Sequence, residues 1–135
     1  MEILTGIVCL LQIADTTFQI KNKINSQEEK QRISNLLKSI GDLVDSVAVD
    51  LEQNVYSHNK CAQMEHFMQN LYSCLKEKIP QEQVDKLVQL MQQSIQVEQL
   101  FGQMQQLDHE VKKENINRLR SSAGSFTAMS QTILL

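Results

Sequence analysis

The sequence has little of what shapes β-sheets and loops. Its 135 residues include one proline, four glycines and no tryptophan, and aromatic residues make up only 4%. An all-β or α/β fold needs turn-forming residues after nearly every strand, and this chain has too few of them. A chain of this length can bury about two thirds of its unfolded surface in a single core. We therefore expect one domain, residues 1–135, of the all-α class with an aliphatic core.

Positive charge is also scarce. The chain has 13 basic and 16 acidic residues, which gives a net charge of −3. General nucleic-acid binding needs a basic surface that faces phosphates, so we expect no nucleic acid as a partner. The three cysteines, Cys9, Cys61 and Cys74, are odd in number and lack a disulfide-like spacing. They indicate reduced thiols in a cytoplasmic protein.

Apolar residues recur at spacings of three and four through most of the chain, which predicts helices with one buried face. After a first helix at about residues 3–24, Ser26 followed by Glu29 is a capping box that predicts the start of a second helix. Within the second helix lies Gly41, and a close helix crossing is the usual reason for a glycine at such a position. The apolar stripe of the second helix is the clearest, and it consists of Ile33, Leu36, Leu37, Ile40, Leu43, Val44, Val47 and Leu51.

Three further helices are predicted. The third is capped by Ser57 or Asn59 and ends near Ile79, the fourth begins at Pro80, and the fifth follows a polar break at 108–110. Such helices pack most simply as an antiparallel bundle, so we predict four to five helices, with an extended coiled coil as the weaker alternative. Their stripes are Cys61, Met64, Phe67, Met68, Leu71, Cys74 and Leu75; Val84, Leu87, Val88, Met91, Ile95, Leu100, Phe101 and Met104; and Val111, Ile116, Leu119, Ala123, Phe126, Met129 and Ile133.

The N-terminal segment differs from the other predicted helices because it is apolar nearly all round. Nine of the twelve residues from Ile3 to Ala14 are apolar, and Glu2 is the only charged residue before Asp15. Such a helix must be buried in a core or in lipid. The segment lacks the basic start and small-residue cleavage site of a signal peptide, and it is shorter than the roughly 20 apolar residues of a transmembrane span. It is either the central helix of the bundle or a segment that enters a membrane, and one helix can do both in different states.

No motif with an assigned chemistry is present. The sequence has no phosphate-binding loop, no HExxH motif and no nucleophile beside a placed base. On a helix, His58, Cys61 and Glu65 would share one face, as a metal site requires, but Cys61 lies on the apolar stripe and a second pair of ligands is missing. His66 and His109 are each flanked by Glu and are expected in solvent. We therefore expect no enzyme, no catalytic residue, no cofactor and no metal.

Charged residues gather in three places. Asp42, Asp45, Asp50 and Glu52 form an acidic stretch with no basic residue between them, and we expect a solvated surface or a partner-facing patch. Two basic groups are either scattered solvating charges or contacts for anionic lipid headgroups. These two groups are Lys21, Lys23, Lys30 and Arg32, and Lys112, Lys113, Arg118 and Arg120.

The first twenty residues, MEILTGIVCLLQIADTTFQI, resemble the N-terminus of the HeLo and HELL domains of fungal cell-death proteins. The plan of a helical bundle of this length is also similar to the executioner bundle of necroptotic pseudokinases and to the bacterial Bell domains. A second resemblance, carried by residues 55–64 and 97–101, is to N-terminal helical domains of cyanobacterial multidomain signalling proteins. Both resemblances imply that the chain is the N-terminal domain of a longer protein, although it lacks the signalling region that usually follows a death domain.

The HeLo-like resemblance implies a cell-death executioner, as in bacterial immunity, that self-associates on a signal from an upstream protein and permeabilises membrane. The chain would then be cytoplasmic and become membrane-associated on activation. The alternative is an adaptor module that recruits partner proteins through the acidic stretch. For the executioner, the residues expected to contact lipid are Ile3, Leu4, Ile7, Val8, Leu10 and Leu11.

Overall fold

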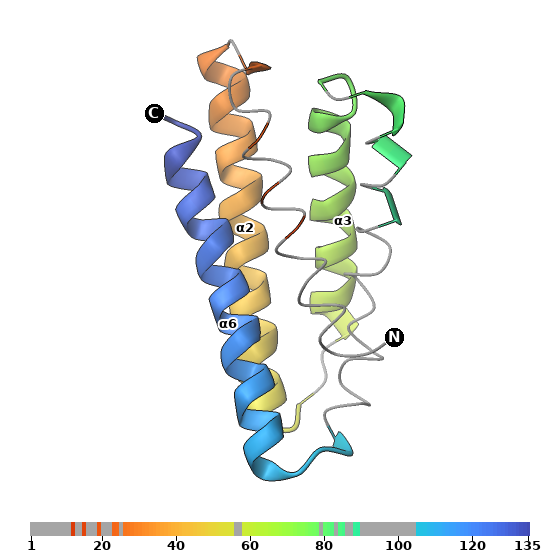
Figure 1. Ribbon diagram of the computed structural model, residues 1–135, viewed down its shortest axis with the longest axis vertical. Coiled ribbons are helices and arrows are strands. Elements are labelled where there is room, and N and C mark those ends of the chain that lie inside the picture. The colour runs from red at the N-terminus through yellow and green to blue at the C-terminus, as the bar shows by residue number, and fades with distance from the viewer. Residues whose placement is uncertain are drawn as a thin grey trace.

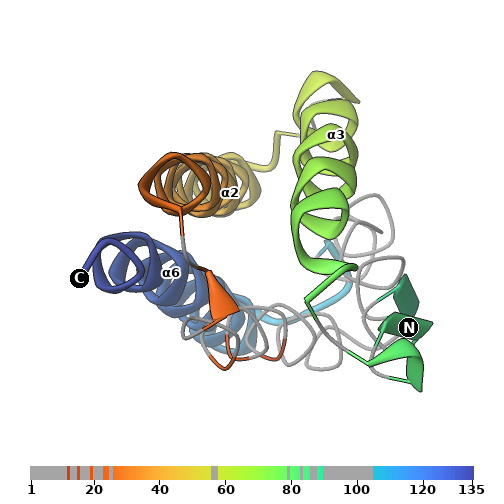
Figure 2. The same ribbon diagram turned by 90° about the horizontal axis from the view of Figure 1, so that it is seen from above.

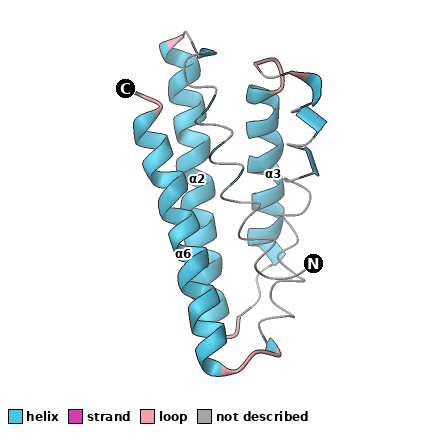
Figure 3. Ribbon diagram, in the orientation of Figure 1, coloured by secondary structure: helices cyan, strands magenta, loops and turns pink. Residues whose placement is uncertain are grey.

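The computed structural model describes residues 12, 15, 19, 23–24, 26–55, 58–78, 80–82, 84–85, 88–89 and 105–135. Its helices in this part of the chain are α2 (Gln27–Glu52), α3 (His58–Leu75) and α6 (His109–Thr132), and no strand occurs there (Figures 1 and 3). The prediction of an all-α fold is confirmed. The apolar N-terminal helix and most of the fourth helix lie outside the described residues, so the number of helices in the bundle stays a prediction.

Helix α2 packs against both α3 and α6, and these two helices run antiparallel to it (Figure 1). Helix α6 lies beside α2 along its length, and the end-on view shows α3 on another side of α2 (Figure 2). Ser34, near the start of α2, donates a hydrogen bond of 2.6 Å to the carbonyl of Ser130, near the end of α6. Lys60, in the first turn of α3, forms an ion pair of 2.5 Å with Asp50, near the end of α2. The antiparallel arrangement predicted for the bundle therefore holds for these two pairs.

Helix α2 begins at the predicted cap, but only half of the capping box is formed. The Ser26 hydroxyl accepts a hydrogen bond of 3.3 Å from the backbone N–H of Glu29, which satisfies one of the free donors of the first turn. The Glu29 carboxylate forms an ion pair of 2.6 Å with Lys78, just beyond α3, instead of capping Ser26 in return. This contact joins residues 49 positions apart, which a local motif cannot foresee.

The predicted stripe of α2 forms the centre of the core. Seven of its eight members are buried, and Leu36 is half-buried and packs against them. Gly41 lies where α2 meets α6, because a Cβ atom there would be only 2.9 Å from the carbonyl oxygen of Ala123 and 3.1 Å from the Cβ atom of Phe126. The close crossing predicted from this glycine is confirmed. Phe126 is fully buried against this seam.

The end of α2 is a Schellman motif. Asn54 has φ = 59°, a left-handed conformation that Asn adopts more easily than most residues. The N–H of Val55 donates to the carbonyl of Asp50 at 2.8 Å, and the N–H of Asn54 donates to that of Leu51 at 3.2 Å. These two bonds satisfy carbonyls that the helix leaves free at its end. They turn the chain sharply toward α3 and hold the Asn54 side chain at a fixed place.

Helix α3 buries a stripe of larger and more flexible side chains than α6 does. Met64, Met68, Leu71 and Leu75 are at most 2% exposed, whereas Phe67 and Cys74 are half-buried beside them. The helix ends at Leu75, four residues before the predicted end. After it, the N–H of Val84 donates to the carbonyl of Pro80 at 3.0 Å, a helical hydrogen bond that agrees with a new helix beginning at Pro80.

Helix α6 corrects the sequence analysis at its start. The side chain of Asp108 caps the helix by accepting a hydrogen bond of 2.9 Å from the N–H of Val111. His109 and Glu110 therefore belong to the first helical turn rather than to a polar break. Val111, predicted in the core, is 39% exposed, because it lies in the first turn of α6, before Asn115, the first buried residue of that helix. From Ile116 to Ile133 the predicted stripe is buried, apart from the half-buried Met129.

Candidate functional site

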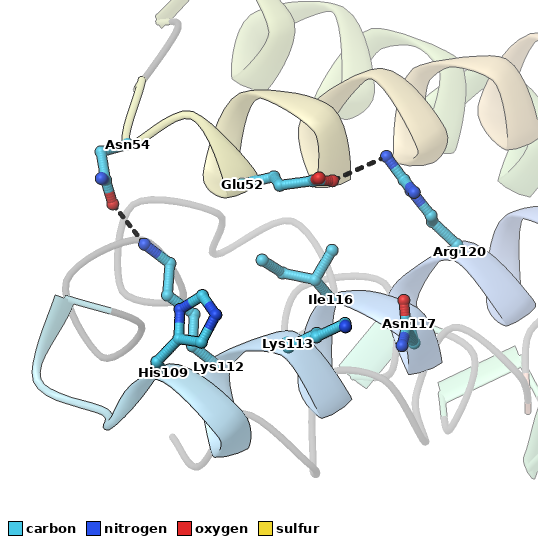
Figure 4. A pocket seen from close by; sticks show the side chains of 8 residues that line it. All are labelled: Glu52, Asn54, His109, Lys112, Lys113, Ile116, Asn117 and Arg120. Carbon is cyan, nitrogen blue, oxygen red and sulfur yellow. Dashed lines mark hydrogen bonds and ion pairs between the residues drawn. The ribbon is translucent and has the colours of Figure 1, made fainter.

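A polar cleft of about 520 Å³ lies where the end of α2 meets the start of α6 (Figure 4). The antiparallel packing brings these two helix ends together, although they are more than 50 residues apart in the sequence. Glu52 and Asn54 form the α2 side of the cleft. The α6 side presents residues one helical turn apart, and they are His109, Lys112, Lys113, Ile116, Asn117 and Arg120.

Arg120 closes the cleft at one end by reaching across to α2. Its Nη2 atom lies 2.9 Å from Oε2 of Glu52, and its Nε atom lies 3.9 Å from Oδ1 of Asp45. A guanidinium carries five N–H donors, so these two contacts leave donors that no other described residue uses. All three side chains are substantially exposed, and exposed ion pairs of this kind contribute little to stability.

Asn54 forms the opposite end of the cleft. Its Oδ1 atom accepts hydrogen bonds from Nζ of Lys112 and from Nε2 of Gln105 (Figure 4). Lys112 is therefore fixed by a neutral amide rather than by a carboxylate. The left-handed backbone of Asn54 places this amide beside α6, so the same residue ends α2 and positions a lysine in the cleft.

The cleft has an excess of positive charge. Lys112, Lys113 and Arg120 face one carboxylate, Glu52, which leaves two positive charges in excess on a chain whose net charge is −3. Neither lysine forms an ion pair within the described part of the chain. Arg118, the fourth member of the predicted basic group, lies outside the cleft and pairs with Glu114 at 2.8 Å. The structure thus brings three of the four predicted basic residues together.

Most of the predicted acidic stretch is engaged within the fold. Asp50 pairs with Lys60 of α3, and the Asp50 side chain is only 18% exposed, so it is not a solvated surface residue as predicted. Asp45 and Glu52 share Arg120. Asp42 is the one acid of the four that forms no ion pair with a residue that the structure describes, and its side chain is exposed. The stretch therefore links α2 to both of its neighbours.

The other predicted candidates are not brought together. The side chains of His58 and Cys61 lie outside the described residues, and among the described ones no group of His, Cys, Asp and Glu could hold a metal ion. His66 is exposed and its Nε2 lies 3.1 Å from the Asn70 amide nitrogen. In the other basic group, Lys21 lies outside the described residues, and Lys23 donates to the carbonyl of Lys78 at 3.1 Å.

The predicted lipid-contacting residues, Ile3, Leu4, Ile7, Val8, Leu10 and Leu11, lie outside the described residues. Over the rest of the chain that the structure describes, only three large apolar side chains are exposed, Val55, Val111 and Leu135. None of the described helices is long and apolar enough to cross a membrane.

Sequence reasoning missed Asn54, Asn117 and the cleft itself. A usable signal for Asn54 was present, because Asn is common just after the end of a helix and the periodicity of α2 lapses there.

Comparison of the chain with protein-family models, with curated proteins and with solved structures finds no match in any of the three.

Proposed function

We propose that this chain is a cell-death executioner domain that permeabilises membrane through its apolar N-terminal segment. In this proposal residues 3–24 form a helix that completes a four- to five-helix antiparallel bundle at rest. An upstream signalling protein brings several copies together, and the segment then leaves the bundle. The domain is cytoplasmic before this step and membrane-associated after it, and no catalytic step is assigned to it. The lipid-contacting residues are Ile3, Leu4, Ile7, Val8, Leu10 and Leu11.

The observation that carries the proposal is the distribution of apolar side chains. The described helices direct their apolar stripes inward, and the exposed Val55, Val111 and Leu135 are scattered over three separate segments. A membrane-active surface needs a contiguous apolar area, which scattered single residues do not supply. The apolar run from Ile3 to Ala14 is the longest in the sequence and is therefore the best candidate for lipid contact.

The energetics of insertion are favourable in magnitude. Transfer of six Ile, Leu and Val side chains from water to lipid contributes on the order of 10 kcal/mol before the costs of ordering. A helix that is buried in a bundle at rest gains less, because its side chains leave a core rather than water. Clustering of several copies supplies the remaining driving force, since it lets segments from neighbouring copies bury one another.

The contacts between α3 and α2 favour this interface, rather than the one between α2 and α6, as the place where the bundle opens to release the N-terminal segment. Two ion pairs join this part of the chain to α2. Lys60, in the first turn of α3, pairs with Asp50, and Lys78, just beyond α3, pairs with Glu29. Partly exposed ion pairs are worth about 1 kcal/mol or less each. The seam between α2 and α6 is instead a close backbone approach around Gly41 with a buried hydrogen bond from Ser34 to Ser130.

The adaptor alternative has less support. It needs the acidic stretch as a free binding face, but Asp45, Asp50 and Glu52 are engaged with Arg120 and Lys60. Charge reversal at Asp42, which is exposed and forms no ion pair with a residue that the structure describes, distinguishes the two functions without breaking the contacts of Asp45 and Asp50. An adaptor would lose its partner while vesicle leakage stayed unchanged.

Dye release from anionic vesicles tests the proposal. The whole chain is fused to a domain that dimerises on addition of a small molecule, and leakage is recorded before and after clustering. The test variant is Ile7→Glu with Leu11→Glu, which places two charges in the apolar segment. The matched control is Gln63→Glu with Gln69→Glu, which adds the same charge at two exposed positions of α3.

We expect clustering to cause leakage with the unchanged chain and the control, and little leakage with the test variant. Helical circular dichroism and thermal unfolding must first show that both variants are folded. Equal leakage from all three proteins, or none from the clustered unchanged chain, would contradict the proposal. A form that lacks residues 1–24 provides a second comparison that does not depend on the two substitutions.

A further inference from the structure

The cleft between α2 and α6 has the features of a binding site for an anion. Its volume of about 520 Å³ falls within the range of about 300–1,000 Å³ that small-molecule sites occupy. Lys112 and Lys113 are adjacent in sequence at the start of α6, and Arg120 lies two helical turns further along the same helix. The cleft is lined by polar groups apart from Ile116, so it suits a polar ligand rather than an apolar peptide.

The charges of the cleft are not balanced by the fold. Lys112 is held by the neutral Asn54 amide, and Lys113 has no ion-pair partner in the described part of the chain. Asp108 and Glu110 lie beside the lysines at the start of α6 but do not line the cleft, and Glu114 is paired with Arg118. Glu52 and Asp45 both face Arg120, whereas Lys112 reaches toward Asn54 and Lys113 points toward Asn117 (Figure 4), so neither lysine is paired with a carboxylate of the described residues.

We infer that this cleft binds a phosphate monoester, with Lys112 and Lys113 as the charge contacts and Arg120 and Asn117 as hydrogen-bond donors. A phosphate monoester carries a charge of about −1.5 to −2 at neutral pH, which matches the two uncompensated positive charges of the lining. A monovalent carboxylate would neutralise only one of them. Guanidinium and ammonium groups together are the usual donors for phosphate oxygens in proteins.

The ordering of Lys112 supports this assignment. Asn54 Oδ1 holds the lysine across the cleft and accepts from Gln105 as well, so two side chains converge on one amide oxygen. A lysine that is positioned before the ligand arrives loses less side-chain entropy on binding. The site does not depend on membrane permeabilisation, because the cleft lies in the part of the chain that stays with α2 and α6.

Two probes distinguish a soluble ligand from a lipid headgroup. Glycerol 3-phosphate is a soluble phosphate monoester, and phosphatidic acid presents the same group on a bilayer. Binding of the soluble probe is followed by amide chemical shifts up to millimolar concentration. Membrane binding is followed by co-sedimentation with phosphatidylcholine vesicles in which one lipid in five is phosphatidic acid, and with vesicles of phosphatidylcholine alone.

The test variant is Lys112→Gln with Lys113→Gln, and the matched control is Lys38→Gln with Lys76→Gln, which removes the same charge at two exposed positions away from the cleft. We expect the test variant to bind at least about tenfold more weakly, and the control to bind as the unchanged chain does. Lys113→Gln alone leaves the Lys112–Asn54 bond intact, so a weakening in this variant cannot be ascribed to a loosened loop.

The outcomes separate cleanly. Binding of glycerol 3-phosphate with shifts confined to the start of α6 assigns a soluble ligand, and binding of phosphatidic acid vesicles alone assigns a headgroup. Equal binding by the test and control variants, or no binding of either probe, would overturn the inference. Vesicle leakage is not measured in this experiment, so failure of the phosphate site and failure of the proposed membrane activity are recognised independently.

Discussion

The interface of α2 with α6 and the interface of α2 with α3 consist of different kinds of side chain and polar contact. Toward α6, α2 presents Gly41 to the backbone of Ala123, and the seam is tightened by a buried hydrogen bond from Ser34 to Ser130. Toward α3, the core contains Met64 and Met68 together with leucines, and the polar contacts are ion pairs at the ends. Small residues allow close backbone approach and little adjustment, whereas methionine adapts to irregular space. We therefore expect the α2–α6 pair to be the rigid unit and α3 to be the adjustable one.

The largest expected effect is the truncation of Phe126. It is fully buried at the close crossing, and Phe126→Ala should lower the free energy of unfolding by about 4 kcal/mol, because the rigid surroundings cannot fill the cavity. Met68→Ala, on the adjustable side, should cost less, about 3 kcal/mol. Urea denaturation followed by circular dichroism measures both. A larger loss for Met68→Ala would reverse the comparison.

Two glycines give the sharpest test of the seam. Gly41→Ala places a Cβ atom 2.9 Å from the Ala123 carbonyl oxygen and should cost about 2 kcal/mol, since backbone must move. Gly124→Ala, on α6, meets no described residue within 4 Å and should stabilise the protein by about 0.5–1 kcal/mol through helix propensity. The two changes are chemically identical, so thermal unfolding of the pair isolates the effect of close approach. Equal shifts in melting temperature would mean that α6 can move away from α2.

A substitution at Asn115 is expected to stabilise the protein rather than destabilise it. Its Oδ1 atom is buried and has no hydrogen-bond partner among the residues that the structure describes, although its Nδ2 atom donates to the carbonyl of Val111 at 2.9 Å. An unsatisfied buried acceptor costs about 1–3 kcal/mol. Asn115→Leu should therefore raise the free energy of unfolding by about 1 kcal/mol. A loss of stability in urea denaturation would indicate that the amide has a partner or that leucine does not fit.

The same contrast explains how far sequence reasoning reached. The stripe of α2 and the meaning of Gly41 were predictable, because they depend on a local period of 3.6 residues and on the steric cost of a side chain at a crossing. The Ser26 cap was predictable for the same reason, but the partner of Glu29 was not, since Lys78 is brought to it only by the packing of α3. Val111 fits the apolar spacing of α6 and is nevertheless exposed.

The cleft could not be predicted because its two walls come from distant segments. Lys112, Lys113 and Arg120 were recognised as a basic group, yet their sequence neighbours Glu110 and Glu114 made the group look like scattered surface charge. The fold pairs Glu114 with Arg118 and sets Asn54, a neutral residue, against Lys112. Acidic residues of α2 were likewise predicted as a surface, and their cationic partners lie 10 to 75 positions away.

The smallest expected effect concerns the ion pair that ties α3 to α2. The Lys60 and Asp50 side chains are 27% and 18% exposed, so their attraction is partly screened by solvent. A double-mutant cycle with Lys60→Met and Asp50→Asn should give a coupling energy of about 0.5–1 kcal/mol that decreases as salt is added. If opening occurs on the α3 side, breaking this pair should also increase amide hydrogen exchange in α3 while leaving that of α2 at the Gly41 crossing unchanged. Equal increases in both helices would show that the three helices open as one unit, and the distinction between a rigid and an adjustable interface would then have to be abandoned.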